Sequence, residues 1–155
     1  MMNYLISSCI VLPMTGKGDK AGHFTASVGL SDGKISLVSD DEGRIESFRR
    51  SCGSELAEID GRGKLLMPGL INMHTHVAMT LMRSYADDIP LMPWLHERIW
   101  PFEAKLTRDD IYVGARLGIA EMLLGGTTSF LDMYWHENAV GEAADGMGIR
   151  AVLSP

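Results

Sequence analysis

The sequence has few cysteines, no excess of positive charge and no long apolar run. Its two cysteines, Cys9 and Cys52, are too few for a four-cysteine zinc site, and with no convincing export signal they favour a reducing, cytoplasmic compartment. Lysine and arginine number 14 against 20 aspartates and glutamates, a net charge of −6 that argues against a nucleic-acid or anionic-membrane surface. No apolar run approaches the ~20 residues that cross a bilayer, so no membrane-spanning helix is expected.

The composition indicates a folded domain. Hydrophobic residues make up 46% of the chain and charged residues 22%, a balance that allows a buried core. The 155 residues suffice for one ordinary domain. They fall short of the ~250 residues typical of an eight-stranded α/β barrel.

The first 66 residues are predicted to form short strands. Gly16, Gly18 and Gly22 interrupt the stretch after the first strand. Asp32-Gly33 between two apolar runs indicates a tight hairpin, because both positions of such a turn must accept a positive φ. The expected strands are Leu5–Leu12, Phe24–Leu30, Lys34–Val38, Arg44–Phe48 and Lys64–Met67. This half is therefore predicted to be all-β and to form one layer of a small sandwich.

After Pro68-Gly69 the hydrophobic pattern changes to strands that alternate with helices. The expected strands are Leu70–Val77, Thr127–Met133 and Ile149–Leu153, with a short helix over Glu137–Gly146 before the last of them. This alternation is typical of a parallel α/β unit.

A helix is predicted in the segment that follows the first of these strands. Leu91, Leu95 and Ile99 recur at a spacing that places them on one helical face. Pro101 is expected to stop or kink this helix, because proline lacks the backbone N–H that a helix interior needs.

A longer helix is predicted before the second strand. Thr107 and Asp110 resemble a capping box, and the helix that they open should end at Leu124, before two glycines. Gly114 and Gly118 lie on one face of it. We expect their small size to permit close packing on a sheet.

Residues with metal-binding chemistry lie at the end of the predicted strand Leu70–Val77. Alternation along a strand places Asn72, His74 and His76 on one face. The other face is expected to carry Ile71, Met73 and Val77. Two imidazoles at this spacing can converge on one ion and would supply half of a tetrahedral site. The alternative is an ordinary pair of core or surface histidines, although two buried histidines without partners would leave nitrogens unsatisfied.

Several segments of the sequence resemble the opening of enzymes of the amidohydrolase superfamily. They are LLMPGLINMHTH (65–76), TLMRSYADD (80–88), PWL (93–95), PFEAKLT (101–107), GGTTSFLDMYWHE (125–137) and GIRAVLSP (148–155). The branch that they most resemble is that of the 5-methylthioadenosine/S-adenosylhomocysteine deaminases, whose neighbours include guanine deaminases and s-triazine chlorohydrolases. The resemblance begins near Leu5 and is specific from Leu65 onward.

The resemblance implies an α/β fold that forms the N-terminal part of a metal-dependent amidohydrolase. Residues 1–66 would be the β-sandwich portion of that enzyme. Residues 67–155 would be the start of its catalytic domain, with the first three strands of a (β/α)8 TIM barrel.

The resemblance also implies roles for individual residues. His74 and His76 match the family's first metal ligands. Glu103 matches a carboxylate that accepts hydrogen bonds from ribose hydroxyls, the alternative being a solvent-exposed glutamate. Trp94 matches an aromatic residue near the substrate entrance, the alternative being a hydrophobic anchor for its helix. For Asp132, at the end of the second barrel strand, we expect structural hydrogen bonding.

The implied activity is hydrolytic deamination of a purine nucleoside of the 5-methylthioadenosine, S-adenosylhomocysteine or adenosine type. One divalent metal ion, expected to be zinc, would activate the attacking water. The family's remaining ligands and its general base come later in the pattern, so we expect this chain to be the front part of a longer enzyme. A guanine deaminase, an s-triazine chlorohydrolase and a non-catalytic fragment are the alternatives, and the sequence leaves homo-oligomer formation open.

Overall fold

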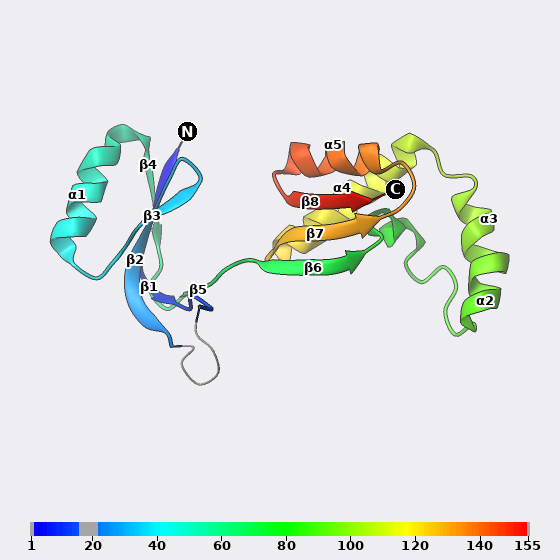
Figure 1. Ribbon diagram of the computed structural model, residues 1–155, viewed down its shortest axis with the longest axis horizontal. Coiled ribbons are helices and arrows are strands. Elements are labelled where there is room, and N and C mark those ends of the chain that lie inside the picture. Colours follow the sequence, from blue (N-terminus) through cyan, green and yellow to red (C-terminus); the bar gives the residue numbers. More distant parts are fainter. Residues whose placement is uncertain (1, 16–21, 155) are drawn as a thin grey trace. The chain divides into compact units, whose positions relative to one another are not determined.

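The computed structural model describes residues 2–15 and 22–154, in two compact units that comprise residues 1–68 and 69–155 (Figure 1). The first unit contains β1 (Asn3–Val11), β2 (Phe24–Ser31), β3 (Lys34–Ser39), α1 (Glu42–Cys52), the 3₁₀ turn η2 (Gly53–Glu55), β4 (Leu56–Asp60) and β5 (Leu65–Leu66). The second contains β6 (Leu70–Thr75), the 3₁₀ helix η3 (Val77–Met82), α2 (Leu91–Pro93), the π-helical turn η4 (Trp94–Ile99), α3 (Trp100–Glu103), α4 (Arg108–Leu124), β7 (Thr127–Met133), α5 (Glu137–Met147) and β8 (Arg150–Ser154). The predicted breaks at Gly16 and Gly18 lie outside the described residues. None of the described helices is long and apolar enough to cross a membrane.

The sheet of the first unit has the strand order β3-β2-β1-β4. β5 pairs with Ile10 and Val11 at the C-terminal end of β1. β2 runs antiparallel to both β1 and β3, whereas β4 and β5 run parallel to β1. The predicted hairpin between β2 and β3 is confirmed. Asp32 and Gly33 have φ angles of 51° and 72°, the positive values that such a tight turn requires.

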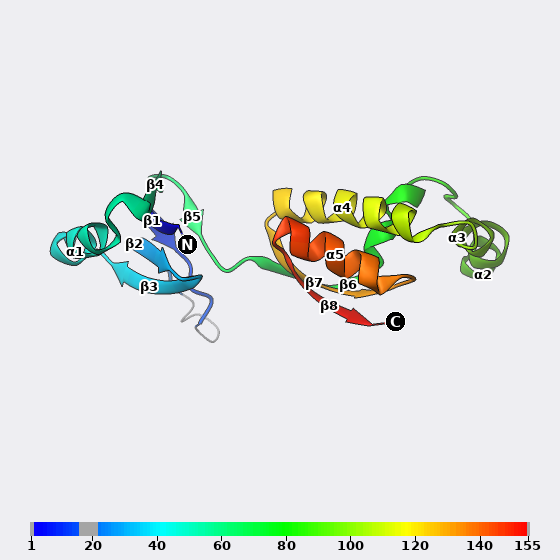
Figure 2. The same ribbon diagram turned by 90° about the horizontal axis from the view of Figure 1, so that it is seen from above.

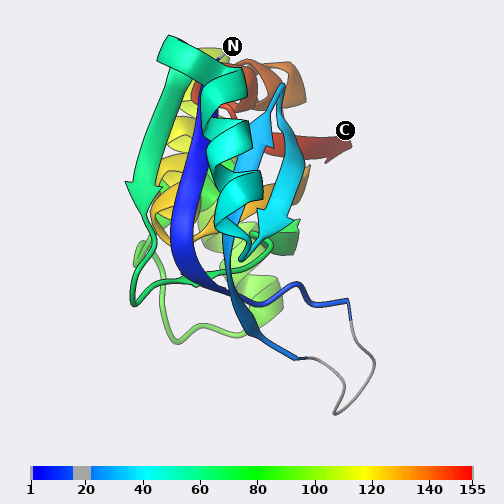
Figure 3. The ribbon, with the colours of Figure 1, turned by 90° about the vertical axis from the view of Figure 1, so that its left-hand side faces the viewer.

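The prediction that this unit is all-β is wrong, because residues 42–52 form helix α1 and not a strand (Figure 3). The Asp41 carboxylate accepts a hydrogen bond from the Arg44 N–H at 2.8 Å and caps the first turn. Ile45 and Phe48, three residues apart, then face the sheet together and pack with Leu5. The sequence 44–48 is too short to separate a strand from a buried helix turn by its pattern alone.

The second unit is built on a parallel sheet with the order β6-β7-β8, as the alternation of strands and helices predicted. Helices α4 and α5 cover one face of it (Figure 2). Phe130 on β7 points into the core beneath these helices and is 2% exposed. The neighbouring side chains Leu131 and Met133 lie on the open face and are 37% and 55% exposed.

Helix α4 begins and ends where the sequence predicted. The Thr107 hydroxyl accepts a hydrogen bond from the Asp110 N–H at 3.3 Å, and the Asp110 carboxylate accepts one from the Thr107 N–H at 2.8 Å. The helix ends at Leu124, and Gly126 follows with a φ of 84°. The capping box therefore fixes the start of the helix, and the glycines allow the chain to reverse into β7.

Residues 91–103 form one run of helical turns, α2, η4 and α3. Of the two predicted effects of Pro101, the stop is not observed, because the helical backbone continues to Glu103, and the kink stays a prediction. Pro101 is the second residue of α3 and directly follows the π-helical turn η4 and Trp100. Of the predicted apolar face, Ile99 is 2% exposed but Leu91 is 66% exposed.

Gly114 and Gly118 permit close packing, but against η3 and not against the sheet as predicted. A Cβ atom at Gly114 would lie 2.7 Å from the carbonyl oxygen of Ala78, and one at Gly118 would lie 2.7 Å from Cγ2 of Val77. The segment that follows β6 thus lies directly on α4. This contact packs the segment directly after His76 against α4.

Replacing Gly114 with alanine should destabilise the protein by about 1–3 kcal/mol, because the new methyl group overlaps backbone atoms that cannot move freely. Gly146→Ala in α5 is the matched control, since nothing lies within 4 Å of its Cβ position and alanine favours a helix. Denaturant unfolding should show a loss for Gly114→Ala and an unchanged or raised stability for Gly146→Ala. Equal effects of the two substitutions would contradict the packing described.

Candidate functional site

The two histidines of the His-Thr-His segment (74–76) lie side by side at the end of β6. His74 is within the strand, and His76 follows its last residue. Their imidazole rings have centroids 5.1 Å apart and meet edge to face at 77°. Two imidazoles that are two residues apart at the end of β6 therefore lie close together, which is the arrangement that joint coordination of an ion requires.

A β-bulge, and not simple alternation, produces this arrangement. β6 pairs with β7 through Asn72 opposite Phe130 and Thr75 opposite Asp132, so β6 has one residue more than β7 in this interval. Asn72 consequently faces the helices, where its amide donates to the sulfur of Met122 on α4 at 3.9 Å. The prediction that Asn72 points with the histidines is wrong.

Two apolar side chains that were expected on the face opposite the histidines also lie elsewhere. Ile71 and Met73 are 63% and 67% exposed. They lie on the open face of the sheet together with Leu131 and Met133. The bulge between Asn72 and Thr75 interrupts the regular alternation of side chains along β6. The histidines thus emerge from an apolar surface.

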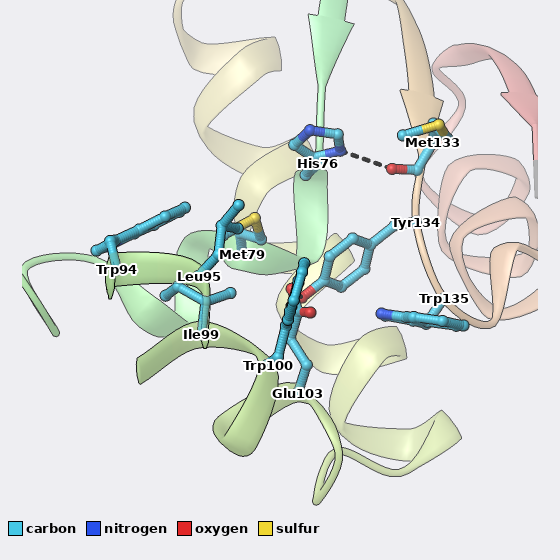
Figure 4. A pocket seen from close by; sticks show the side chains of 10 residues that line it. All are labelled: His76, Met79, Trp94, Leu95, Ile99, Trp100, Glu103, Met133, Tyr134 and Trp135. Carbon is cyan, nitrogen blue, oxygen red and sulfur yellow. Dashed lines mark hydrogen bonds between the residues drawn. The ribbon is translucent and has the colours of Figure 1, made fainter. Parts of the chain in front are cut away.

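The end of β7 fixes the orientation of His76. Its Nδ1 atom lies 2.6 Å from the carbonyl oxygen of Met133, and since a carbonyl can only accept, Nδ1 must carry the proton (Figure 4). The next residue, Val77, donates its N–H to Oδ1 of Asp132 at 2.9 Å. The lone pair of His76 is therefore on Nε2, free to bind an ion.

Asp132 has the structural hydrogen bond that was expected of it, but its surroundings were not foreseen. It is 1% exposed, and burial raises the pKa of its carboxyl group. Its Oδ2 atom and both carboxylate oxygens of Glu137 are buried with no hydrogen-bond partner among the described residues. Burial and the negative charge of Asp132 raise the pKa of Glu137 to about 7. Nothing in the sequence marks Glu137, since its burial depends on how α5 docks.

An aromatic cavity of about 410 Å³ opens beside His76 (Figure 4). It is lined by residues from the ends of β6 and β7 and from the helical run 91–103: His76, Met79, Trp94, Leu95, Ile99, Trp100, Glu103, Met133, Tyr134 and Trp135. Trp94 and Glu103, which the family resemblance singled out, both line it. Tyr134 and Trp135 were missed, although they directly follow a strand in a parallel sheet, where ligand-binding residues gather.

Glu103 is half-buried and accepts a hydrogen bond from the hydroxyl of Tyr134 at 2.7 Å. The alternative of a solvent-exposed glutamate is therefore not observed. Burial and the adjacent Glu103 carboxylate raise the pKa of Tyr134. The cavity thus has imidazole at one end, a carboxylate held by a phenol at the other, and aromatic rings along its walls, an arrangement that suits a flat ring carrying polar groups.

Part of a metal site can be identified in this arrangement. No group of three or more His, Cys, Asp or Glu side chains close enough to hold an ion occurs in the described ranges 2–15 and 22–154. His74 and His76 together supply two nitrogen ligands, and a catalytic zinc usually has three protein ligands. Their donor type and shared side fit zinc, as one half of its ligand set.

Glu137 should make the stability of the protein depend on pH. Because its folded pKa of about 7 exceeds the ordinary value near ~4.3, ionisation opposes folding increasingly as the pH rises between these values. Glu137→Gln removes that charge, so its melting temperature relative to the wild type should rise by a few degrees, on the order of 2–5 °C, between pH 5 and pH 8. Calorimetry with a metal chelator present measures this difference.

The matched control is Asp145→Asn, at an exposed position of the same helix. Its melting temperature relative to the wild type should stay constant between pH 5 and pH 8. A difference for Glu137→Gln that is equally constant would show that Glu137 is ionised without penalty.

Two curated proteins of similar sequence carry the same name. A 5-methylthioadenosine/S-adenosylhomocysteine deaminase of Desulfitobacterium hafniense (strain DSM 10664 / DCB-2) is 43% identical over 153 residues, which are 99% of this chain and 34% of the relative. The enzyme of that name from Symbiobacterium thermophilum is 42% identical over 156 residues. This chain therefore spans about a third of the length of the curated relatives that it matches.

Solved structures of similar fold include enzymes that act on different heterocycles. An adenosine deaminase from Xanthomonas campestris with bound zinc matches 97% of this chain over 33% of its own, with a TM-score of 0.76 and 31% identity. The atrazine chlorohydrolase of Arthrobacter aurescens TC1 complexed with zinc matches 97% over 35%, with a TM-score of 0.77 and 27% identity. The guanine deaminase of E. coli, at 20% identity and a TM-score of 0.75, shares the fold.

The family assignment comes from the second unit and the four residues before it, 65–68. The sequence pattern of the amidohydrolase family matches residues 65–155, which include both histidines, the aromatic cavity and all three parallel strands. The mixed α/β architecture agrees with the solved structures over nearly the whole chain. The chain belongs to the amidohydrolase family.

Proposed function

We propose that this chain is the N-terminal part of a metal-dependent aminohydrolase that deaminates an adenine nucleoside of the 5-methylthioadenosine, S-adenosylhomocysteine or adenosine type. Residues 1–66 would be its β-sandwich portion, and residues 67–155 would open its barrel, with β6, β7 and β8 as the first three strands. The observation that carries the proposal is the pair of adjacent imidazoles at the mouth of a cavity that also contains Glu103. The shared name of the curated relatives supports the substrate class.

His74 and His76 would hold the metal ion. The hydrogen bond from His76 Nδ1 to Met133 leaves Nε2 for this role, and the zinc named in two similar structures favours zinc. When bound, zinc lowers the pKa of a coordinated water toward ~7 and so provides hydroxide at neutral pH. The remaining ligands and the groups that transfer protons would come from other parts of the complete enzyme.

The cavity would bind and orient the nucleoside. Trp94, Trp100 and Trp135 offer flat apolar surfaces for the purine and exclude water from it. Glu103 would accept hydrogen bonds from the sugar hydroxyls at the opposite end from His76. These contacts would place the reacting ring carbon near the histidines, so that binding energy far from that carbon serves positioning.

A related hydrolase of another heterocycle is the second candidate, favoured by the similar structures of an atrazine chlorohydrolase and a guanine deaminase. Such a substrate has no ribose, so Glu103 would have no sugar hydroxyls to bind. The placement of Glu103 on the cavity wall with a hydrogen-bonded carboxylate favours the nucleoside. A non-catalytic fragment would retain the fold without binding metal.

Removal of either histidine should abolish metal binding and deamination together. The full-length protein is expected to retain about one zinc per chain after dialysis, whereas His74→Ala and His76→Ala should retain none, because each substitution removes a ligand. His96→Ala is the matched control, because His96 is exposed and does not line the cavity. Elemental analysis after dialysis, with ammonia release from adenosine, measures both effects. Full turnover by a zinc-free variant would refute the proposed hydrolysis.

Glu103 should distinguish nucleosides from free bases. Glu103→Gln in the full-length enzyme should lower kcat/KM for adenosine at least about tenfold, because the charged acceptor for the sugar hydroxyls is lost. Any activity on adenine should change little, since the free base has no sugar. Glu97→Gln, at an exposed position on the same helical run, is the control. Equal losses on nucleoside and base would move the assignment toward the second candidate.

A further inference from the structure

The hydroxyl of Tyr134 joins two parts of the cavity that are remote in the sequence. It donates to Oε1 of Glu103 at 2.7 Å and thereby connects the residue after β7 with the end of α3 (Figure 4). The phenol is the donor in this bond, and the carboxylate oxygen of Glu103 accepts. Oε1 is therefore engaged by the protein, while Oε2 carries no bond to any described residue and can accept from a ligand.

Tyr134 is itself held in a fixed place. Its side chain is half-buried, and its ring lies 6.0 Å from the ring of His76 at a tilt of 38°. Burial and the Glu103 carboxylate both raise the pKa of the phenol, so the hydroxyl keeps its proton at neutral pH. One aromatic side chain thus stands between the histidine and the carboxylate and contacts both.

Glu103 depends on this contact for its orientation. It is the last residue of a four-residue helical turn, after which Ala104 and Lys105 are exposed. No other hydrogen bond or ion pair of its side chain occurs within the described ranges. Without the phenol, the carboxylate could rotate into the adjoining cavity that it shares with His136, or into solvent.

We propose that Tyr134 is a positioning residue for Glu103 and so sets the preference of the enzyme for substrates that carry sugar hydroxyls. This inference rests on the proposed function. Tyr134 donates no hydrogen bond to a substrate hydroxyl, because its single proton is directed to Glu103. It acts by holding one carboxylate oxygen so that the other faces the sugar, at a fixed distance from His76.

The test compares adenosine with 2′,3′-dideoxyadenosine, which keeps the base, the sugar ring and the 5′ hydroxyl but lacks the 2′ and 3′ hydroxyls that Glu103 would bind. In the full-length, zinc-loaded enzyme, Tyr134→Phe should raise KM for adenosine about three- to tenfold, the effect of losing one hydrogen bond. Its kcat/KM for the dideoxynucleoside should stay within about twofold of the wild type. Tyr112→Phe, a hydroxyl deletion on α4 outside the cavity, should leave both substrates unaffected.

A double-mutant cycle separates positioning from general damage. If Tyr134 acts through Glu103, adding Tyr134→Phe to Glu103→Gln should cost nothing further on adenosine. Multiplied losses in the double variant, equal losses on the two nucleosides, or an unchanged KM for adenosine in Tyr134→Phe would each overturn the inference. Zinc content and circular dichroism establish that the variants are folded and loaded.

The proposed function fails in a different way. If Glu103→Gln loses equally on both nucleosides, Glu103 does not bind the sugar, and the proposed function falls together with the inference. If Glu103→Gln discriminates between them and Tyr134→Phe does not, only the role of Tyr134 is wrong.

Discussion

Two hydrogen bonds to acceptors at the end of β7 fix the backbone and the imidazole where the chain leaves β6. Val77 donates its N–H to the buried Asp132 carboxylate, and the His76 ring donates to the Met133 carbonyl. Because both acceptors are adjacent in β7, they fix the turn and the side chain as one unit. The position of the imidazole, and with it the opening of the cavity, depends on this junction between two parallel strands.

The junction places a polar group where burial is costly. Burial of a carboxylate without hydrogen-bond partners is energetically unfavourable. The hydrogen bond from the Val77 N–H offsets part of this desolvation cost for Asp132. Glu137 lies close enough for the charge of Asp132 to raise its pKa, so the two carboxyl groups are not readily ionised together. Gly114 and Gly118 allow η3, which follows His76, to pack closely on α4.

Local sequence signals predicted most of the fold. Asp32-Gly33 predicted a hairpin because both residues tolerate the positive φ angles of its turn. Thr107 and Asp110 predicted the start of α4 because their side chains bond to backbone N–H groups of the first helical turn. Arg44–Phe48 was assigned as a strand because its apolar residues suit either structure, and the Asp41 cap that decides the matter lies outside that window. The helical run passes through Pro101 and continues to Glu103, so the predicted stop is wrong.

The candidate site was predictable only in part. His74 and His76 follow from their motif, but the bulge that turns Asn72 away depends on the pairing of β6 with β7, which no local pattern encodes. The contact between Tyr134 and Glu103 joins residues 31 positions apart and depends on the tertiary fold.

The most direct test of the account is anomalous diffraction at the zinc edge from crystals of the full-length protein grown with zinc. The account predicts a single strong peak on the open face of the β6-β7-β8 sheet, with one nitrogen of His74 and Nε2 of His76 each about 2.0–2.1 Å from it. A peak bound to His76 through Nδ1, or a zinc ion bound elsewhere with neither histidine as a ligand, would contradict it.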